Sequence, residues 1–301
     1  MELRTSRKAY FFSLTVLILL TLLTVYTAVQ RPARYHDQAD IEATRLVKAE
    51  ELISAVEDDA ETALRVASYR AFLALDEAVL RRDGYVSGFD DKFEELVTNG
   101  TLDGQEQDLL NATALEDWKN QTSLVASHLH YRLNFTGHEI RAYHEGPWHV
   151  TVALDTELLL VDERSDAQWR VPLNITAKVP VRGLYDPLYT VGTGQRYFQR
   201  VTPAPQGASA ADLVHDRLYI NSTKGPTYLQ RLQGNINPSP FGIESLVNTT
   251  TLAGVGAEQE GSIIDWHYLD DQRPADCTIT GLPSWAAINT TQPARFGVSC
   301  S

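Results

Sequence analysis

Two stretches in the middle of the chain, WHVTVALDTELLLV (residues 148–161) and WRVPLNITAKVPV (residues 169–181), alternate apolar with polar residues. The positions that share the apolar face are Trp148, Val150, Val152, Leu154, Leu158 and Leu160 in the first stretch and Trp169, Val171, Leu173, Ile175, Ala177, Val179 and Val181 in the second. A period of two is typical of strands with one buried face, so this pattern predicts two antiparallel strands. The intervening DERSDAQ (residues 162–168) predicts a hairpin loop, and Pro172 and Pro180 predict edge positions or bulges.

The period of two begins at His138, and we expect residues 137–301 to form a β-rich ectodomain. The segment TPAPQGASAAD (residues 202–212) is rich in Pro, Gly and Ala and predicts a division of this region into two lobes. The chain has two cysteines, Cys277 and Cys300, near its C-terminal end. In an oxidising compartment we expect them to form a disulfide, which would stabilise the fold by about 3 kcal/mol.

Residues 84–136 read as a helical segment. FDDKFEELVTNG (residues 89–100) predicts a short helix with an Asn-Gly stop. NATALEDWKNQTSLVASHLHYRL (residues 111–133) predicts another helix, in which Leu115, Trp118 and Leu129 are the expected core contacts.

Residues 31–83 predict an extracellular helical stem. Pro32 predicts an interruption or kink at its start, the helical pattern runs from about Asp37 to Arg82, and Gly84 ends it. Its apolar positions recur at spacings of three and four, and many are alanines. The small-residue seam consists of Ala60, Ala63, Ala67, Ala71, Ala74 and Ala78. Such a seam either packs on copies of the same helix or covers the chain's own β domain. If it forms the assembly contact, Ala67→Glu or Ala71→Glu would abolish multimers while the head still folds.

Residues 9–30 carry no charged side chain and predict a helix that crosses a membrane or forms a filament core. The basic residues of the preceding tip, residues 1–8, place that tip in the cytoplasm by the positive-inside rule. The remainder then lies outside the cell, as a single-pass membrane protein with an extracellular C-terminal domain. The predicted fold class is therefore α+β, with a long N-terminal helix (membrane span plus stem) followed by a β-rich, mainly antiparallel head.

Asparagine occurs almost always in the context N-x-[ST] that accepts N-linked glycans. The eight sequons are those of Asn99, Asn111, Asn120, Asn134, Asn174, Asn221, Asn248 and Asn289, out of ten asparagines in the chain. Chance alone predicts about one or two, given the share of Ser and Thr. The sequence therefore predicts a glycoprotein, although Asn and Thr are also ordinary residues of turns and strands.

Composition and motifs exclude several functions. A formal charge of −13 argues against a nucleic-acid partner, which needs a basic surface. HEGPWH (residues 144–149) has a spacing of five and a Gly-Pro break, which does not suit a helical zinc site. No phosphate-binding loop, dinucleotide motif or nucleophile elbow is present, so we predict no catalytic residue, no metal site and no cofactor.

Three segments carry a resemblance to a known group of proteins. They are AYFFSLTVLILL (residues 9–20), VPVRGLYDPLYTV (residues 179–191) and GPTYLQRLQGNINPSPFGIESLV (residues 225–247). They resemble uncharacterised archaeal membrane-anchored surface proteins, whose N-terminal layout is similar to that of type IV pilin-like proteins. The resemblance implies surface display, and cleavage just before the apolar run is the pilin-like alternative to a retained span. The resemblance implies no catalytic role for the two later segments.

These observations lead to three functional hypotheses. The first is a structural surface protein, a pilin-like subunit or membrane-anchored glycoprotein that assembles through its N-terminal helix. Its partners would be the lipid bilayer, further copies of the chain in a homo-oligomer or filament, and N-linked glycans. The second is a monomeric membrane-anchored module that binds a cell-surface partner or glycan. The third is an anchored hydrolase, which would need convergent polar residues in a deep cleft.

Overall fold

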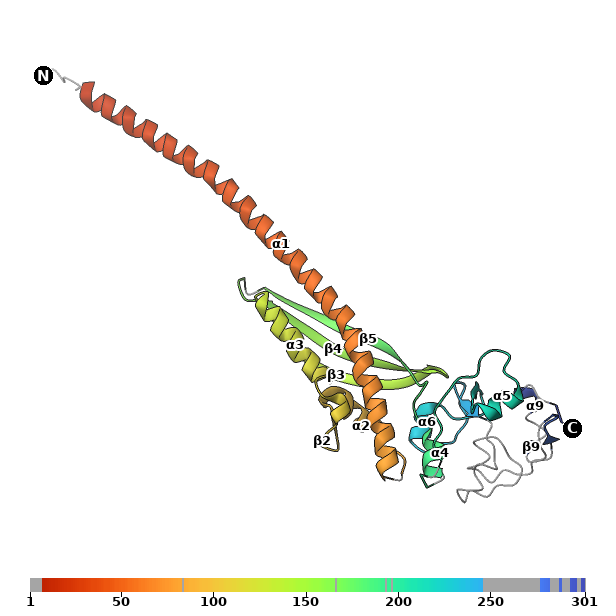
Figure 1. Ribbon diagram of the computed structural model, residues 1–301. Coiled ribbons are helices and arrows are strands. Elements are labelled where there is room, and N and C mark those ends of the chain that lie inside the picture. The colour runs from red at the N-terminus through yellow and green to blue at the C-terminus, as the bar shows by residue number, and fades with distance from the viewer. Residues whose placement is uncertain are drawn as a thin grey trace. The chain divides into compact units, whose positions relative to one another are not determined.

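A computed structural model describes residues 7–245 except 83, 166, 193 and 196, together with residues 277–281, 287–288, 293–296 and 299–300. The chain divides into two units, Met1–Val56 and Glu57–Ser301. Helix α1 (Arg7–Arg82) contributes residues to both units (Figure 1). The helix continues through Pro32, where the sequence predicted an interruption, and it ends two residues before Gly84.

The predicted membrane span is wrong. Within the described residues, no helix combines the length and the apolar character needed to cross a membrane. The predicted span of residues 9–30, the fold class that included it and the single-pass localisation that rested on it are all corrected. The observed fold class is α+β with antiparallel sheets.

A three-stranded antiparallel sheet dominates the second unit, with strand order β3-β4-β5. The strands are β3 (Tyr131–Gly146), β4 (His149–Asp162) and β5 (Gln168–Pro180) (Figure 1). The alternation predicted for β5 is confirmed, because Leu173, Ile175, Ala177 and Val179 are buried and the residues between them are exposed. In β4 the predicted apolar face is buried, but Thr151 and Ala153 on the opposite face are buried as well, so this strand does not have one wet side. The predicted hairpin loop and the edge position of β5, with its exposed prolines, are also confirmed.

Strand β3 begins at Tyr131, seven residues before the predicted start at His138. A bulge between Thr136 and His138 shifts the register, and Gly137 there has φ 65°. The shift changes which residues face the core, so the alternation does not run continuously through the strand. The helix predicted to reach Leu133 therefore ends earlier, since α3 spans Leu115–His128.

Short elements connect α1 to the sheet. They are α2 (Phe89–Asn99), β1 (Thr101–Leu102), β2 (Gln105–Glu106), the 3-10 helix η1 (Asp108–Leu110) and α3. Gly100 ends α2 with φ 72°, as the Asn-Gly stop predicted. On α3, Leu115 is buried, and the ring centroid of Trp118 lies 5.2 Å from that of Phe135. Leu129, the residue after α3, is exposed, contrary to prediction.

The face of α1 that carries the small-residue seam belongs to the core of its own unit. Ala60, Ala67, Ala71 and Ala74 are buried, and Ala63 and Ala78 are half-buried. Next to them, Phe72 stacks on Phe93 of α2, with 4.8 Å between ring centroids. Of the two possibilities that the sequence left open, the described residues therefore display packing within the chain.

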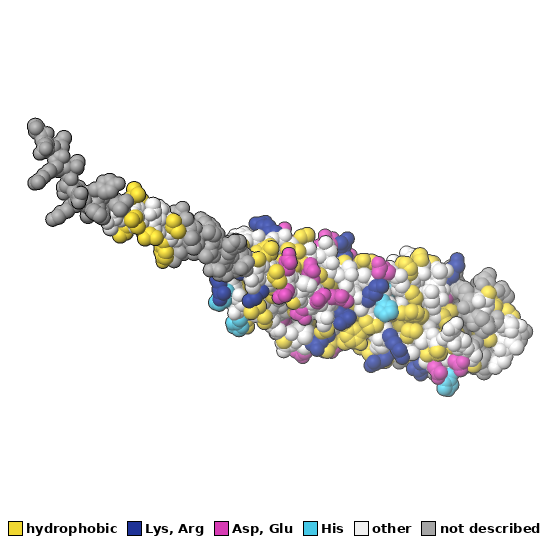
Figure 2. Space-filling view, turned by 90° about the horizontal axis from the view of Figure 1, so that it is seen from above, with side chains coloured by type: hydrophobic (Ala, Val, Ile, Leu, Met, Phe, Trp, Pro, Cys, Tyr) yellow, Lys and Arg dark blue, Asp and Glu magenta, His cyan; other side chains and the backbone are white. Residues whose placement is uncertain are grey.

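The apolar side chains nearer the N-terminal end of α1 have the opposite environment (Figure 2). We call Thr15 to Tyr26 the apolar segment. Its large side chains are 45–64 % exposed within the chain, and these are Val16, Leu17, Ile18, Leu19, Leu20, Leu22, Leu23, Val25 and Tyr26.

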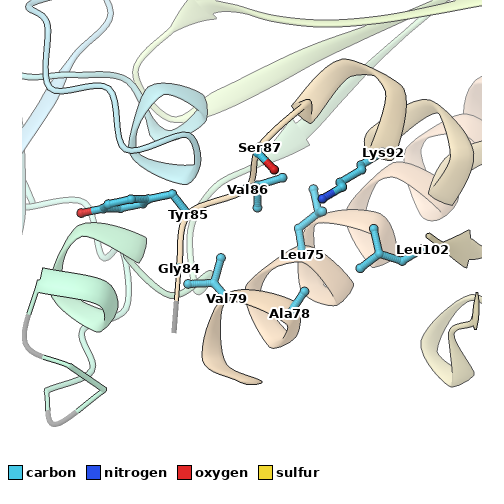
Figure 3. A pocket seen from close by; sticks show the side chains of 9 residues that line it. All are labelled: Leu75, Ala78, Val79, Gly84, Tyr85, Val86, Ser87, Lys92 and Leu102. Carbon is cyan, nitrogen blue, oxygen red and sulfur yellow. The ribbon is translucent and has the colours of Figure 1, made fainter. Parts of the chain in front are cut away.

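The remaining elements follow β5. They are α4 (Pro187–Gly192), α5 (Ala210–His215), β6 (Tyr219–Asn221), α6 (Tyr228–Leu232), β7 (Ile243–Ser245), β8 (Cys277–Thr278), β9 (Ala287–Ile288) and α9 (Pro293–Phe296). Strands β6 and β7 pair with each other, as do β8 and β9. The turn between α1 and α2 passes through Tyr85 and Val86, which lie beside the α6 region (Figure 3).

Candidate functional site

The densest group of polar side chains in the described residues lies inside the second unit. It consists of Asp76, Asp186, Tyr219, Tyr228 and Arg231, all of them buried, and we call it the buried polar cluster. Its members come from α1, the start of α4, β6 and α6. Residues that are distant in sequence therefore meet at one point.

Local structure fixes the two charged residues at the centre of the cluster. Asp186 precedes Pro187, and its Oδ1 accepts a hydrogen bond of 3.0 Å from the backbone N–H of Leu188 at the start of α4. Arg231 lies on α6, which begins with a capping box between Thr227 and Gln230. Such a box satisfies the first free N–H groups of a helix and so defines where it starts.

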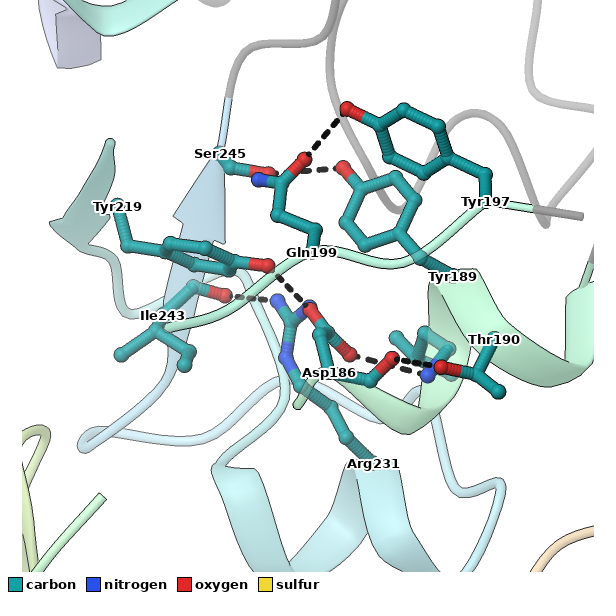
Figure 4. Close-up of polar contacts among 10 residues, drawn as sticks. Asp186, Tyr189, Thr190, Tyr197, Gln199, Tyr219, Arg231, Ile243 and Ser245 are labelled. Carbon is teal, nitrogen blue, oxygen red and sulfur yellow. Dashed lines mark hydrogen bonds and ion pairs between the residues drawn. The ribbon is translucent and has the colours of Figure 1, made fainter. Parts of the chain in front are cut away.

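Asp186 and Arg231 form a fully buried ion pair (Figure 4). The Nη1 atom of Arg231 lies 2.6 Å from Oδ2 of Asp186, and the hydroxyl of Tyr219 donates to the same oxygen over 2.8 Å. Arg231 also donates through Nη2 to the carbonyl oxygen of Ile243 on β7. The pair therefore joins α4, α6 and the β6-β7 ribbon.

Asp76 brings α1 into the same cluster. Its Oδ1 accepts from the hydroxyl of Tyr228 over 2.7 Å, and its Oδ2 accepts from the backbone N–H of Tyr185 over 2.8 Å. Burial raises the pKa of Asp76 to about 7, an effect that these two hydrogen bonds oppose. Burial likewise raises the pKa of Tyr228 well above its usual value.

Two further hydrogen bonds extend this polar interior (Figure 4). The hydroxyl of Tyr189 lies 2.7 Å from Oγ of Ser245, and the hydroxyl of Tyr197 donates to Oε1 of Gln199 over 3.0 Å. The rings of Tyr189 and Tyr197 are also in edge contact, with 5.6 Å between centroids. These contacts tie α4 to β7 and to the segment that follows α4.

The arrangement suits a structural role, in which the buried polar cluster holds α1, α4, α6 and the β6-β7 ribbon together. Asp186, Tyr219, Tyr228 and Arg231 are completely inaccessible to solvent, so a substrate could not touch them without local opening. Their polar groups already bind one another, which leaves them poorly placed for acid–base or nucleophilic chemistry on a bound molecule. A hydrogen-bonded network of this kind favours one arrangement of the elements that it joins.

Some members of this cluster have a signal in the sequence. Asp186 and Arg231 lie in the two segments, residues 179–191 and 225–247, that carry the resemblance, for which the resemblance implies no catalytic role. Asp76 lies four residues after Phe72 and three before Val79, both buried. A carboxylate on an apolar stripe of a helix was the signal that could have identified it.

The predicted glycan acceptors are on the surface wherever the structure describes them. The exposed ones are Asn99, Asn111, Asn120, Asn134, Asn174 and Asn221. Asn248 and Asn289 lie outside the described residues. Exposure is the geometric condition for attaching a glycan, and glycosylation itself stays a prediction.

The predicted disulfide between Cys277 and Cys300 is confirmed, with a Cα–Cα distance of 5.0 Å. It links β8 to the last described residues, where Ile279 also pairs with Cys300 in a β-bridge. This pairing confirms the interpretation of the two cysteines as a structural cross-link.

The histidine-rich stretch has hydrogen-bonding roles. Nδ1 of His144 lies 2.9 Å from the carbonyl oxygen of Gly146, and Nε2 accepts from the N–H of Leu229 over 3.4 Å. Burial lowers the pKa of His144, which agrees with a neutral ring that donates at Nδ1 and accepts at Nε2. Among the residues that the structure describes, no three His, Cys, Asp or Glu side chains gather as metal ligands.

Comparison with other proteins gives no family assignment. The chain matches no protein-family model, no curated protein and no solved structure. The site must therefore be interpreted from its own geometry.

Proposed function

We propose that the protein is a non-catalytic structural subunit that assembles with copies of itself through the apolar segment of α1. The supporting observation is the exposure of nine large apolar side chains between Val16 and Tyr26 (Figure 2). A helix that is apolar on all sides is normally covered by other structure. Exposed apolar surface of this kind marks an interaction site.

The polar groups of the segment do not oppose such packing. The hydroxyl of Thr21 donates to the carbonyl oxygen of Ile18, and that of Thr24 to the carbonyl oxygen of Thr21, each over 2.8 Å. Because these hydroxyls bond to their own helix, burying them costs little free energy.

A second copy of the chain is the occupant that we propose. The described side chains between Thr15 and Tyr26 include no charge, so two such helices offer each other no repulsive contact. Apolar side chains from parallel or antiparallel copies can interdigitate along the helix, as in helical bundles. The small-residue seam is not the proposed contact, because it is covered within the chain.

The test measures the mass of the full-length protein in solution by light scattering after size exclusion. We expect a discrete multimer for the natural chain. The variant Leu19→Gln/Leu23→Gln changes two exposed leucines one helical turn apart, and we expect its mass to fall toward that of the monomer. The matched control is Leu124→Gln, because Leu124 on α3 is 60 % exposed and Leu19 64 %.

According to the proposal, the mass falls only when the leucines are removed from the apolar segment. Removing an exposed leucine elsewhere should leave the mass unchanged. A monomeric natural chain would refute the proposal. It would equally be refuted if the double variant kept the natural mass, or if Leu124→Gln lowered the mass as much as the double variant did.

A further inference from the structure

A cavity of about 200 Å³ lies where α1 turns into α2 (Figure 3). Its walls come from the end of α1, the turn at residues 84–88, the first part of α2 and β1. Aliphatic side chains form most of the lining, and these are Leu75, Ala78, Val79, Val86 and Leu102. All of these residues belong to the second unit.

The turn that forms one wall is held in place by contacts with the α6 region. The backbone N–H of Val86 donates to the carbonyl oxygen of Leu232 over 2.8 Å. The ring of Tyr85 packs against Gly234, which has φ 70°, and a Cβ added there would lie 2.5 Å from Cδ2 of Tyr85. Only glycine permits this close approach. The cavity is therefore preformed, which reduces the entropy that a ligand must overcome.

Among the described residues that line this cavity, Lys92 is the one cation. It reaches from α2 toward Leu75 (Figure 3), and its side chain is only 22 % exposed. Its ion pair with Asp103 is loose, because Nζ lies 3.7 Å from Oδ1. A charge-assisted hydrogen bond is typically about 2.8 Å long, so the ammonium can still donate to a closer anion. Ser87 adds a hydroxyl to the same lining.

We propose that this cavity binds a small amphiphilic monocarboxylate. The carboxylate would accept from the ammonium of Lys92, and the apolar tail would lie among the aliphatic side chains. The cavity volume of about 200 Å³ suits a short alkyl tail. Asp103 already places one carboxylate near Lys92, so a monoanion fits this site better than a phosphate dianion, which would add more unbalanced negative charge.

The experiment is a titration of the full-length protein with sodium hexanoate, followed by heteronuclear NMR. We expect saturable shifts that map to residues around the cavity. Hexylamine has the same number of carbons and the opposite charge, and we expect at least tenfold weaker binding. Lys92→Gln should weaken hexanoate binding by at least tenfold. The matched control is Lys178→Gln, an exposed lysine on β5, which should leave binding unchanged.

Ala78→Leu fills the cavity from the α1 side and should abolish binding while the spectrum remains that of a folded protein. If that variant does not fold, Lys92→Gln decides the question alone. Absence of saturable hexanoate binding would overturn the proposal, as would equal binding by Lys92→Gln or equal binding of hexylamine. The cavity and the apolar segment share no residues. The two proposals can therefore fail separately. A chain that does not bind hexanoate could still form the multimer, and a monomeric chain could still bind hexanoate.

Discussion

The two parts of α1 have opposite environments although both are rich in apolar residues. In the apolar segment Leu19 is 64 % exposed, whereas Leu64 and Leu75 further along the helix are completely buried. The later part has its apolar residues at spacings of three and four, with acidic residues on the other face. The apolar stripe of this later part packs into the core of the second unit. The apolar segment has no such division into two faces, and its large side chains are exposed among the residues that the structure describes.

The largest effect is expected from a charge placed on the buried apolar stripe in the later part of α1, which we call the covered stripe. We expect Ala67→Glu to destabilise the second unit by about 5 kcal/mol, because Ala67 is completely buried and a carboxylate there would have no partner. That is a large part of the stability of a typical domain. If the seam were the assembly contact, Ala67→Glu would abolish multimers while the head still folded, whereas the buried position predicts loss of the fold. Urea unfolding followed by circular dichroism measures the effect.

The neighbouring position provides the control for Ala67→Glu. Val66 lies on the same helix and is 38 % exposed. Val66→Glu should change the free energy of unfolding by no more than about 0.5 kcal/mol. If both variants were equally stable, the later part of α1 would not be covered in solution, and the contrast between the two parts of the helix would disappear.

A second test addresses the cluster that secures the covered part of α1. Arg231→Met leaves the carboxylate of Asp186 buried without its cation, and we expect a loss of about 4 kcal/mol in the free energy of unfolding. The double variant Arg231→Met/Asp186→Asn removes both charges and should recover part of that loss. Chemical denaturation of the two variants measures the difference.

The exposed pair Arg81–Glu77 on α1 gives the matched control for a broken ion pair. Its side chains are 71 % and 42 % exposed, and solvent screens such pairs strongly. Arg81→Met should therefore cost no more than about 0.5 kcal/mol. A double variant no more stable than Arg231→Met alone would contradict the charge argument, because the loss would then come from packing.

The central sheet could be predicted from the sequence because alternation, the hairpin loop and the edge prolines are local signals. The start of β3 could not, since the bulge at Gly137 shifts the register partway along the strand. The end of α3 was also missed, where His130 adopts φ 64° and leads the chain into β3. A non-glycine residue in that conformation carries no clear mark in a sequence.

The buried polar cluster depends on contacts between residues far apart in the chain. Asp76 and Tyr228 are separated by 152 positions, and Asp186 and Arg231 by 45. A single sequence contains no signal for such pairings. For the apolar segment, the composition was evident from the sequence. The absence of charged residues did not reveal which other helix or surface contacts it.

The smallest expected effect is a pH dependence caused by Asp76, the polar residue on the covered stripe. Its pKa is about 7 in the folded chain and near 3.8 when unfolded. Between these values the folded state binds more protons, so stability falls as the pH rises from about 4 to 7. The shift corresponds to at most about 4 kcal/mol, and relaxation around the ionised carboxylate should reduce the loss to about 2 kcal/mol. Urea unfolding at pH 5 and pH 8 measures it.

Asp76→Asn isolates this contribution from every other titrating group. An amide stays neutral at both pH values, and its oxygen can still accept from Tyr228 or from the N–H of Tyr185. The groups that act on Asp76 are Tyr228, Tyr185, Asp186 and Arg200, and all of them remain in the variant. We expect the natural chain to lose about 2 kcal/mol more than the variant between pH 5 and pH 8. Equal losses would mean that Asp76 is ionised throughout this range, and the carboxylate would then have access to water or to a cation such as Arg200.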